Sequence, residues 1–348
     1  MADARTFRIA VIPGDGIGQE VVPEGIRVLD RLGSFQYEHF PWGCQYYLQT
    51  GRMMDADGLE RLVQFDAIYF GAVGWPSVPD HVSLWGLRLA ICQGFDQYAN
   101  LRPVRLLHGV ESPLRRAESM DWIVVRENTE GEYAGIGGRN LSGRGHGKEV
   151  AIQAGLFTEE GCERIMRFAF ELARRRRKKL TSVTKSNAQQ YGMTLWDEVF
   201  RRTAADYPDI EIEQWLVDAM AARFVLRPET LDVVVASNLF ADILSDLGSA
   251  LAGSLGIAAS ANLNPERRFP SMFEPVHGSA PDIAGQGIAN PIGAIWSASL
   301  MLDHLGLPDA AQRVVRAIEA TTSAGVLTPD LGGRASTREV TDAILSHL

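Results

Sequence analysis

Short apolar runs alternate with amphipathic segments along most of the chain. The runs are rich in β-branched or aromatic residues, which predicts strands, and they cover residues 7–12, 35–40, 65–74, 98–105, 122–126, 180–185, 210–217 and 231–236. Helical periodicity predicts helices at residues 19–32, 162–173, 238–246 and 290–305. Residues 253–264 are small and glycine-rich, and residues 273–282 are expected to form a loop. Alternating strands and helices predict an α/β sheet.

The most informative helix follows the run at residues 231–236. Ser237 or Asn238 can cap it. Asp242 and Asp246 are four residues apart and therefore lie on one helix face, where like charges destabilise an isolated helix by about 0.2–0.5 kcal/mol. A divalent cation held by both carboxylates would offset this repulsion. The alternative is that the helix dipole favours Asp242 in the first turn and that Asp246 is solvated.

A glycine-rich turn at residues 13–18 joins the first strand to the first helix. This order of strand, glycine turn and helix is typical of phosphate-binding sites. The dinucleotide fingerprint GxGxxG is not completed, however, because its last glycine would fall at Gln19. Glu38 in the next strand imitates the ribose-binding acid of that fingerprint, and we do not interpret it as part of a Rossmann site.

Composition limits the class of protein. The 348 residues are enough for one large or two medium domains, and the net charge of -9 argues against nucleic acids and anionic membrane surfaces as partners. The basic run at residues 174–179 is more typical of a solvated helix end than of an anion site. Cys44, Cys92 and Cys162 show no CxxC spacing, which predicts reduced thiols and a cytoplasmic location. No signal peptide and no membrane-spanning run are expected.

Several polar residues stand where predicted strands end, which is where open α/β sheets bind ligands. Arg102 and Arg126 are suited to carboxylate oxygens, or form surface ion pairs. Lys185 is a candidate base if its pKa is lowered by burial, or a lysine whose amine reaches solvent. Tyr133 is a candidate proton donor or a packing residue, and Asp218 is a further acid. With the aspartate pair they fit a small polyanionic substrate, and the reaction types left open are metal-assisted oxidation, hydrolysis and aldol chemistry.

Five motifs now give a resemblance to a known family. They are residues 12–18 (IPGDGIG), 100–103 (NLRP), 126–131 (RENTEG), 238–246 (NLFADILSD) and 277–285 (HGSAPDIAG). In this order they resemble the metal-dependent β-decarboxylating dehydrogenases, the isocitrate/isopropylmalate dehydrogenase family. Residues 71–76 and 84–86 are most similar to its tartrate/D-malate branch.

The resemblance implies an isopropylmalate-dehydrogenase-like two-domain α/β fold with a central sheet, which is not a Rossmann fold. Residues 1–103 and 257–348 would form a large cofactor-binding domain. Residues 104–256 would form a smaller domain with the dimer interface and a protruding arm at residues 139–148. The implied protein is a cytoplasmic homodimer whose site is shared between subunits.

The resemblance also implies roles for the site residues. Arg102 and Arg126 would hold the substrate carboxylate. Asp242 and Asp246 would bind Mg²⁺ or Mn²⁺ together with Asp218 of the partner subunit, and K⁺ is an optional further ion. Lys185 of the partner subunit would take part in deprotonating the substrate hydroxyl, and Tyr133 would protonate the enol left after CO₂ loss. The expected reaction is oxidation of a small 2-hydroxy diacid, D-malate or tartrate, with decarboxylation where a β-carboxylate is present.

Residues on the last third of the chain would bind the cofactor; they are Glu274, His277, Gly278, Ser279, Ala280, Asp282 and Asn290. The carboxylate of Asp282 can accept hydrogen bonds from ribose hydroxyls and would repel a 2′-phosphate, so NAD⁺ is expected rather than NADP⁺. One position departs from the family pattern, because Cys92 stands where a first substrate arginine is usual. Arg88, one helical turn away, could compensate. The alternatives are therefore a catalytically impaired homologue that serves as a binding or regulatory subunit, or a dehydrogenase of another hydroxy diacid such as 3-isopropylmalate.

Overall fold

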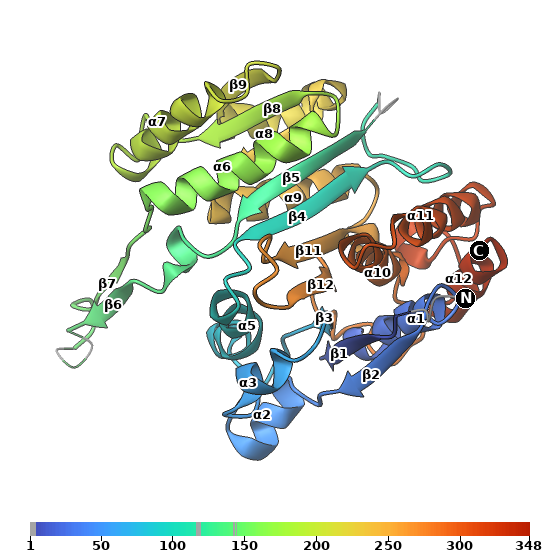
Figure 1. The fold of residues 1–348 in the computed structure, drawn as a ribbon. Helices are drawn as coiled ribbons and strands as arrows, with labels where there is room; N and C mark the ends of the chain where they lie inside the picture. Colours follow the sequence, from blue (N-terminus) through green and yellow to red (C-terminus); the bar gives the residue numbers. More distant parts are fainter. Residues whose placement is uncertain (1–4, 116–119, 142, 144) are drawn as a thin grey trace. The chain divides into compact units, whose positions relative to one another are not determined.

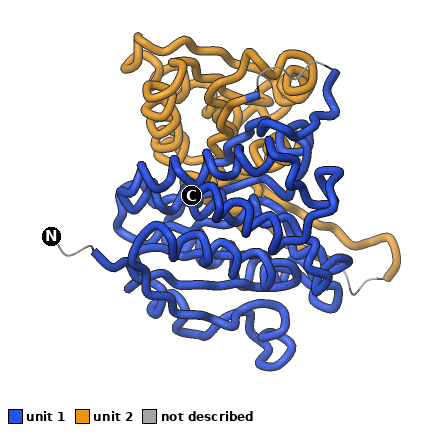
Figure 2. Tube along the Cα trace, turned by 90° about the vertical axis from the view of Figure 1, so that its right-hand side faces the viewer, with its two compact units in different colours: residues 1–97, 101–120, 248–348 blue, residues 98–100, 121–247 orange. Residues whose placement is uncertain are grey.

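The computed structural model describes residues 5–115, 120–141, 143 and 145–348 (Figure 1). Two compact units divide the chain (Figure 2). Unit 1 contains residues 1–97, 101–120 and 248–348, and unit 2 contains residues 98–100 and 121–247. Each unit is therefore built from segments that are separated along the chain.

These limits differ from the predicted domain boundaries at three places, because residues 98–100 were expected in the large domain but lie in unit 2. Residues 104–120 and 248–256 were expected in the smaller domain but lie in unit 1. The two segments contact each other, because the Ser112 hydroxyl donates a hydrogen bond of 2.6 Å to the Leu251 carbonyl. Such contacts join residues far apart in sequence and leave no local sequence signal.

Unit 1 is built on strands in the order β2-β1-β3-β12-β11. Their bounds are β1 (Phe7–Gly14), β2 (Phe35–His39), β3 (Ala67–Ala72), β11 (Ala259–Leu263) and β12 (Ser271–Pro275). The pairs of β1 with β2, β1 with β3 and β12 with β3 are parallel, and β11 is antiparallel to β12. Every residue of β3 is buried, as expected for a parallel strand covered on both faces.

Helices of unit 1 pack on these strands. Their bounds are α1 (Gly18–Leu29), α2 (Cys44–Thr50), α3 (Gly58–Leu62), α4 (Asp80–Ser83), α5 (Leu89–Gly94), α10 (Ile292–His304), α11 (Pro308–Ser323) and α12 (Thr337–Ser346). Helix α10 is apolar all round and almost wholly buried, because it contacts β11 and β12 on one side and α1 and α11 on others. The prediction of a long apolar helix after Asn290 is confirmed.

Unit 2 carries four parallel strands in the order β5-β10-β8-β9. Their bounds are β5 (Asp121–Glu127), β8 (Lys179–Thr184), β9 (Glu211–Leu216) and β10 (Val233–Ala236). The helices are α6 (Glu159–Arg174), α7 (Gly192–Ala204), α8 (Val217–Leu226) and α9 (Asn238–Leu251), the last of which continues into unit 1. Strand β4 (Ala99–Arg105) also has residues in both units. The strands and the helices α6 and α9 were expected from the sequence, whereas α7 and α8 were not predicted.

A two-stranded antiparallel hairpin of unit 2 coincides with the predicted arm. Strand β6 (Gly137–Asn140) pairs with β7 (Val150–Gln153), and Figure 1 shows the hairpin standing apart from the other elements of the unit. Ser142 and Arg144 of the predicted arm lie outside the described residues. The hairpin exposes apolar side chains, and Ile152 is 66% exposed to solvent. Exposed apolar side chains that lie together are typical of an interaction surface.

One local prediction is wrong. Residues 273–282 were expected to form a loop, but residues 273–275 belong to strand β12, in which every residue is buried. The strand exists because it pairs with β3 on one side and β11 on the other. Its few apolar residues end in a proline, so the sequence alone favours a loop.

The basic run at residues 174–179 is engaged with acidic side chains. Its ion pairs include Arg174–Asp209 (2.8 Å), Arg176–Asp232 (2.8 Å) and Lys179–Glu213 (2.9 Å). Helix α6 ends at Arg174, so the run follows a helix end as predicted, but Arg176 and Lys179 are held in ion pairs and are not solvated. Cys44, Cys92 and Cys162 are free and buried. Within the part of the chain that the structure describes, no helix combines the length and apolar character needed to cross a bilayer.

Candidate active site

Asp242 is the centre of a cluster of polar side chains in unit 2. It lies on α9, which begins directly after the buried strand β10. The guanidinium of Arg126, at the end of β5, forms an ion pair with Asp242. The Tyr133 hydroxyl donates a hydrogen bond of 2.9 Å to the other carboxylate oxygen, and the guanidinium carbon of Arg126 lies 5.1 Å from the Tyr133 ring centroid. The structure thus brings three predicted site residues together from three separate segments.

Asn238 orients this cluster and was predicted only as a helix cap. Its side-chain oxygen accepts a hydrogen bond of 2.8 Å from Arg126 Nε, and its amide nitrogen donates one of 3.1 Å to the Glu130 carbonyl. Arg126 is 2% exposed, and a buried guanidinium is costly unless its donors are satisfied. Asn238 therefore holds the guanidinium group of Arg126 in the orientation that faces Asp242. Its position one turn before Asp242 was the only sequence signal for this role.

Asp242 and Asp246 provide a carboxylate pair of the kind that binds Mg²⁺ or Mn²⁺. Asp242 has a half-buried side chain and Asp246 is exposed one turn further along α9. Carboxylate oxygens are the donors that hard divalent cations take, so the chemistry of this pair fits such an ion. Among the residues the structure describes, no three acidic, histidine or cysteine side chains gather into a metal-binding group. Asp218 therefore does not complete the pair within one chain.

Asp218 is instead paired with Lys185. Lys185 directly follows β8, Asp218 stands in the first turn of α8, and Lys185 Nζ lies 2.6 Å from Asp218 Oδ1. The hydrogen bond from Lys185 lowers the pKa of the Asp218 carboxyl. The resemblance implies that Asp218 and Lys185 come to the site from the partner subunit. Because the two residues are neighbours within one chain, one subunit could contribute both of them to the same site.

The predicted cofactor loop lies in unit 1 and is held by the glycine-rich turn. Ile17 N donates a hydrogen bond of 2.8 Å to the Ser279 carbonyl. A Cβ atom at Gly16, where φ is +54°, would stand 2.0 Å from that same carbonyl oxygen. The position therefore requires glycine. The carboxylate of Glu20 accepts hydrogen bonds from Gly285 N (2.6 Å) and Gly287 N (3.0 Å), so the first helix also fixes the far end of the loop.

The side chains of this loop differ in their hydrogen bonding and in their exposure to solvent. The Nε2 atom of His277 is buried and has no hydrogen-bond partner among the described residues. Burial lowers the His277 pKa, so the imidazole is neutral at pH 7. Asp282 is exposed. Asn290 is committed to the fold, because it donates to Asp330 (3.0 Å) and accepts from Ile292 N (3.0 Å). Ala280 has a φ of +39°, a strained conformation that is enriched at ligand sites.

A cavity of about 510 Å³ lies beside this loop in unit 1. Its lining consists of Gly14, Asp15, Gly16, Gln19, Gln45, Leu48, Trp75, Ala284 and Gly285. It stands at the carboxyl end of β1, the sheet edge at which α/β proteins bind ligands, and its size is within the range of small-molecule sites. Asp15 shapes one wall by accepting hydrogen bonds from Cys44 N (2.8 Å) and Gly74 N (2.9 Å). The size and position of the cavity fit a nucleotide cofactor, and His277 is not among its lining residues.

Known proteins match the chain over nearly its whole length. The profile for isocitrate/isopropylmalate dehydrogenase matches residues 8–344. The chain belongs to the isocitrate/isopropylmalate dehydrogenase family. This membership confirms the family that the motifs indicated.

Relatives within the family are similar in sequence and in structure. A probable tartrate dehydrogenase/decarboxylase of Agrobacterium vitis is 58% identical over 353 residues, covering 99% of this chain and 96% of the relative. The D-malate dehydrogenase [decarboxylating] of Escherichia coli is 56% identical, covering 98% of each chain. A crystal structure of isocitrate dehydrogenase from Methylococcus capsulatus has a TM-score of 0.90 at 36% identity, covering 98% and 99%. The predicted fold class is thereby confirmed.

The position that departs from the family pattern is buried in unit 1. Cys92 is 0% exposed and belongs to a hydrophobic cluster that includes Trp42 and Phe95. Arg88 is also buried, where it forms an ion pair of 2.7 Å with Glu274 and a hydrogen bond of 3.3 Å to Asn262. Glu274, predicted to bind the cofactor, thus neutralises Arg88 within this unit. Arg88, which was expected to compensate for Cys92, is therefore already engaged in a buried ion pair. Arg102 lies in β4 with a buried side chain.

Proposed function

We propose that this family member is an NAD⁺-dependent dehydrogenase that requires Mg²⁺ or Mn²⁺ and oxidises D-malate or tartrate. Decarboxylation follows where the substrate has a β-carboxylate. The observation that carries the proposal is the contact of Arg126 and Tyr133 with Asp242 on α9. The names of the relatives, tartrate dehydrogenase/decarboxylase and D-malate dehydrogenase [decarboxylating], support the substrate class.

Asp242 and Asp246 would hold the divalent ion. When bound, the ion would supply positive charge near the substrate oxygens, and NAD⁺ would serve as the hydride acceptor. Arg126 binds a substrate carboxylate through its planar fork, and Asn238 keeps that fork oriented. Arg102 would bind the substrate as well.

Proton transfer is assigned to a tyrosine and a lysine. The Tyr133 hydroxyl oxygen lies 2.9 Å from Asp242 Oδ2. From this hydroxyl a proton would be delivered to the carbon that loses CO₂. Lys185 of the partner subunit would take part in removing the proton of the substrate hydroxyl. Its pairing with Asp218 supports a site to which both residues come from a second copy of the chain.

The assembly we propose is a cytoplasmic homodimer that places this lysine and aspartate beside the carboxylates of α9. The exposed apolar side chains of the β6–β7 hairpin, such as Ile152, support a role in subunit contact. K⁺ is proposed as an optional further ion. The substrates are small molecules, and the net charge of -9 argues against nucleic acid and membrane partners.

A substrate panel tests the proposal most directly. The purified protein is mixed with NAD⁺, Mn²⁺ and K⁺ and offered D-malate, both tartrate enantiomers, meso-tartrate, isocitrate and 3-isopropylmalate. NADH absorbance reports oxidation and evolved CO₂ reports decarboxylation. We expect NADH with D-malate or a tartrate, and CO₂ in step with NADH for D-malate. No NADH with any hydroxy diacid would refute the assignment.

The coenzyme preference rests on Asp282, and we expect Asp282→Lys to change it. The exposed carboxylate repels a 2′-phosphate, whereas a lysine attracts one. The ratio of kcat/KM for NAD⁺ to that for NADP⁺ should fall at least about tenfold, equivalent to about 1.4 kcal/mol. Asp303→Lys, an equal charge change at another exposed aspartate of unit 1, is the matched control. An unaltered ratio in the Asp282→Lys variant would show that Asp282 does not face the ribose.

Cys92 motivates the alternative that the chain is an impaired homologue acting as a binding or regulatory subunit. We expect Cys92→Arg to lower activity on D-malate and the free energy of unfolding, because an arginine at this fully buried position loses its hydration. The loss of stability should reach several kcal/mol, on the order of that for an unpaired buried charge. Cys92→Ser is the size-matched control in thermal melting and NADH assays. A large gain of activity in Cys92→Arg would favour the impaired homologue instead.

A further inference from the structure

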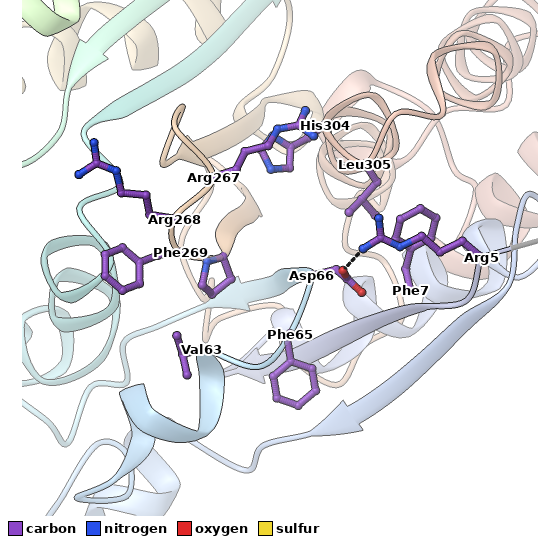
Figure 3. A pocket seen from close by; sticks show the side chains of 11 residues that line it. Arg5, Phe7, Val63, Phe65, Asp66, Arg267, Arg268, Phe269, His304 and Leu305 are labelled. Carbon is purple, nitrogen blue, oxygen red and sulfur yellow. Dashed lines mark hydrogen bonds and ion pairs between the residues drawn. The ribbon is translucent and has the colours of Figure 1, made fainter.

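A second cavity in unit 1, of about 290 Å³, is distinct from the one beside the cofactor loop (Figure 3). It is bordered by residues that precede three parallel strands, namely Phe7 at the start of β1, Asp66 just before β3 and Pro270 just before β12. The glycine-rich turn lies at the opposite, carboxyl end of β1. The cavity therefore stands at the other edge of the sheet from the proposed coenzyme site.

Basic side chains outnumber acidic ones in the lining of this cavity. They are Arg5, Arg267, Arg268 and His304, against one carboxylate, Asp66. Asp66 is already engaged, because it accepts from Arg5 Nη2 at 2.5 Å and from Arg8 N at 2.8 Å. Arg267 and Arg268 have no ion pair and no side-chain hydrogen bond with any residue that the structure describes. The cavity thus carries two exposed guanidinium groups that no described residue neutralises.

A rigid turn presents these two arginines. Asn264 is 1% exposed, and its side-chain oxygen accepts a hydrogen bond of 2.8 Å from Arg268 N. Its backbone carbonyl accepts one of 2.9 Å from Arg267 N. Arg267 has a φ of +56°, a conformation that costs a side-chain-bearing residue roughly 1–2 kcal/mol. Both arginines are exposed, and the turn fixes where their side chains begin.

Apolar side chains form the rest of the wall. Phe7 and Phe65 are almost fully buried, and Phe269 and Leu305 also border the space. The His304 ring lies 5.5 Å from that of Phe273. Burial and the charge of Arg267 lower the His304 pKa to about 4, so at pH 7 its imidazole is uncharged. Figure 3 shows Phe269 beside Arg268, Phe7 beside Arg5 and Arg267 extending toward His304, so aromatic rings and guanidinium groups alternate around the space.

We propose that this cavity binds a small organic polyanion with two or more carboxylate or phosphate groups. Arginine forks recognise both groups through paired N–H bonds, and the volume exceeds the need of a single inorganic ion while remaining too small for a macromolecule. This function goes beyond the proposed dehydrogenase activity, because none of the lining residues belongs to the proposed substrate, metal or coenzyme sites.

Calorimetric titration of the full chain with citrate and with pyrophosphate tests the proposal and separates the two chemistries. The double variant R267A/R268A should bind the preferred probe at least about tenfold more weakly, since hydrogen bonds to charged groups are lost. The control variant R316A/R338A removes two exposed arginines of unit 1. Its dissociation constant for the probe should stay within about twofold of that of the unmodified chain, a smaller change than the loss of one charged hydrogen bond produces. Repeating each titration with R102A/R126A in the background removes binding by the two proposed substrate arginines.

A second variant tests the cavity without removing its arginines. Val63 lines the space and is 47% exposed, so Val63→Glu adds a carboxylate at little cost to folding and should also weaken binding severalfold. Tighter binding of citrate would identify a carboxylate ligand, and tighter binding of pyrophosphate a phosphate ligand. The proposal is overturned if neither probe binds at a concentration of about 10 mM, at which even a ligand with a millimolar dissociation constant would bind. Equal affinities of R267A/R268A and the unmodified chain would overturn it as well.

Discussion

Replacing Asp242 by asparagine should abolish turnover while leaving the fold intact. The Asp242 carboxylate is the point at which Arg126 and Tyr133 meet, and in our proposal it also holds the divalent ion. Asparagine has the same size and keeps one oxygen acceptor, but it lacks the negative charge that both the ion and the arginine require. Metal-ion stabilisation contributes several kcal/mol to a transition state, so kcat/KM should fall by about 10³ or more.

Steady-state NADH assays over a range of Mn²⁺ concentrations measure this effect, and higher Mn²⁺ should restore part of the rate. Asp309→Asn makes the same chemical change at an exposed position of α11 and should leave the rate within twofold, far less than the tenfold change that about 1.4 kcal/mol produces. Circular dichroism monitors folding of both variants. Activity of Asp242→Asn within about tenfold of the unmodified enzyme would rule out a principal role in metal binding.

Mixing two inactive variants should restore activity if the site is shared. Lys185→Ala removes the proposed partner-derived base, and general acid–base groups contribute roughly 10²–10⁴-fold to rate. Asp242→Asn removes the ion-binding carboxylate. In a mixed dimer with twofold symmetry, one site carries both defects and the other carries neither. Random exchange makes half of the dimers mixed, so the mixture should regain about a quarter of the unmodified rate.

Subunit exchange has to be shown independently, for example by native mass spectrometry of differently tagged chains. A mixture of Asp242→Asn with Asp246→Asn is the matched control, because both changes fall on the same helix α9 and no mixed dimer would contain an intact site. Failure of Lys185→Ala and Asp242→Asn to complement after confirmed exchange would mean that each site is built from a single chain. The pairing of Lys185 with Asp218 leads us to expect complementation.

Much of the fold can be read from the order of the residues. Strands such as β1 and β10 are short, apolar and β-branched, and the helices that follow them show clear periodicity, so local preference and final structure agree. Strand β12 was missed because its signal is not local: its residues are extended only since β3 and β11 flank them. The ends of the two units were misplaced for the same reason, because contacts such as that between Ser112 and Leu251 join distant segments.

By itself, the sequence determined the fold class, the family and the types of residues available for chemistry. It did so because strand and helix periodicity act within a few residues, and because the motifs around Asp242 and His277 are contiguous. Only the tertiary structure decided what those residues contact. It placed Arg126 and Tyr133 on Asp242, engaged Arg88 with Glu274, and left the side chains of Arg267 and Arg268 without a partner among the described residues. Such pairings depend on the distances between segments after folding, and no spacing along the chain encodes those distances directly.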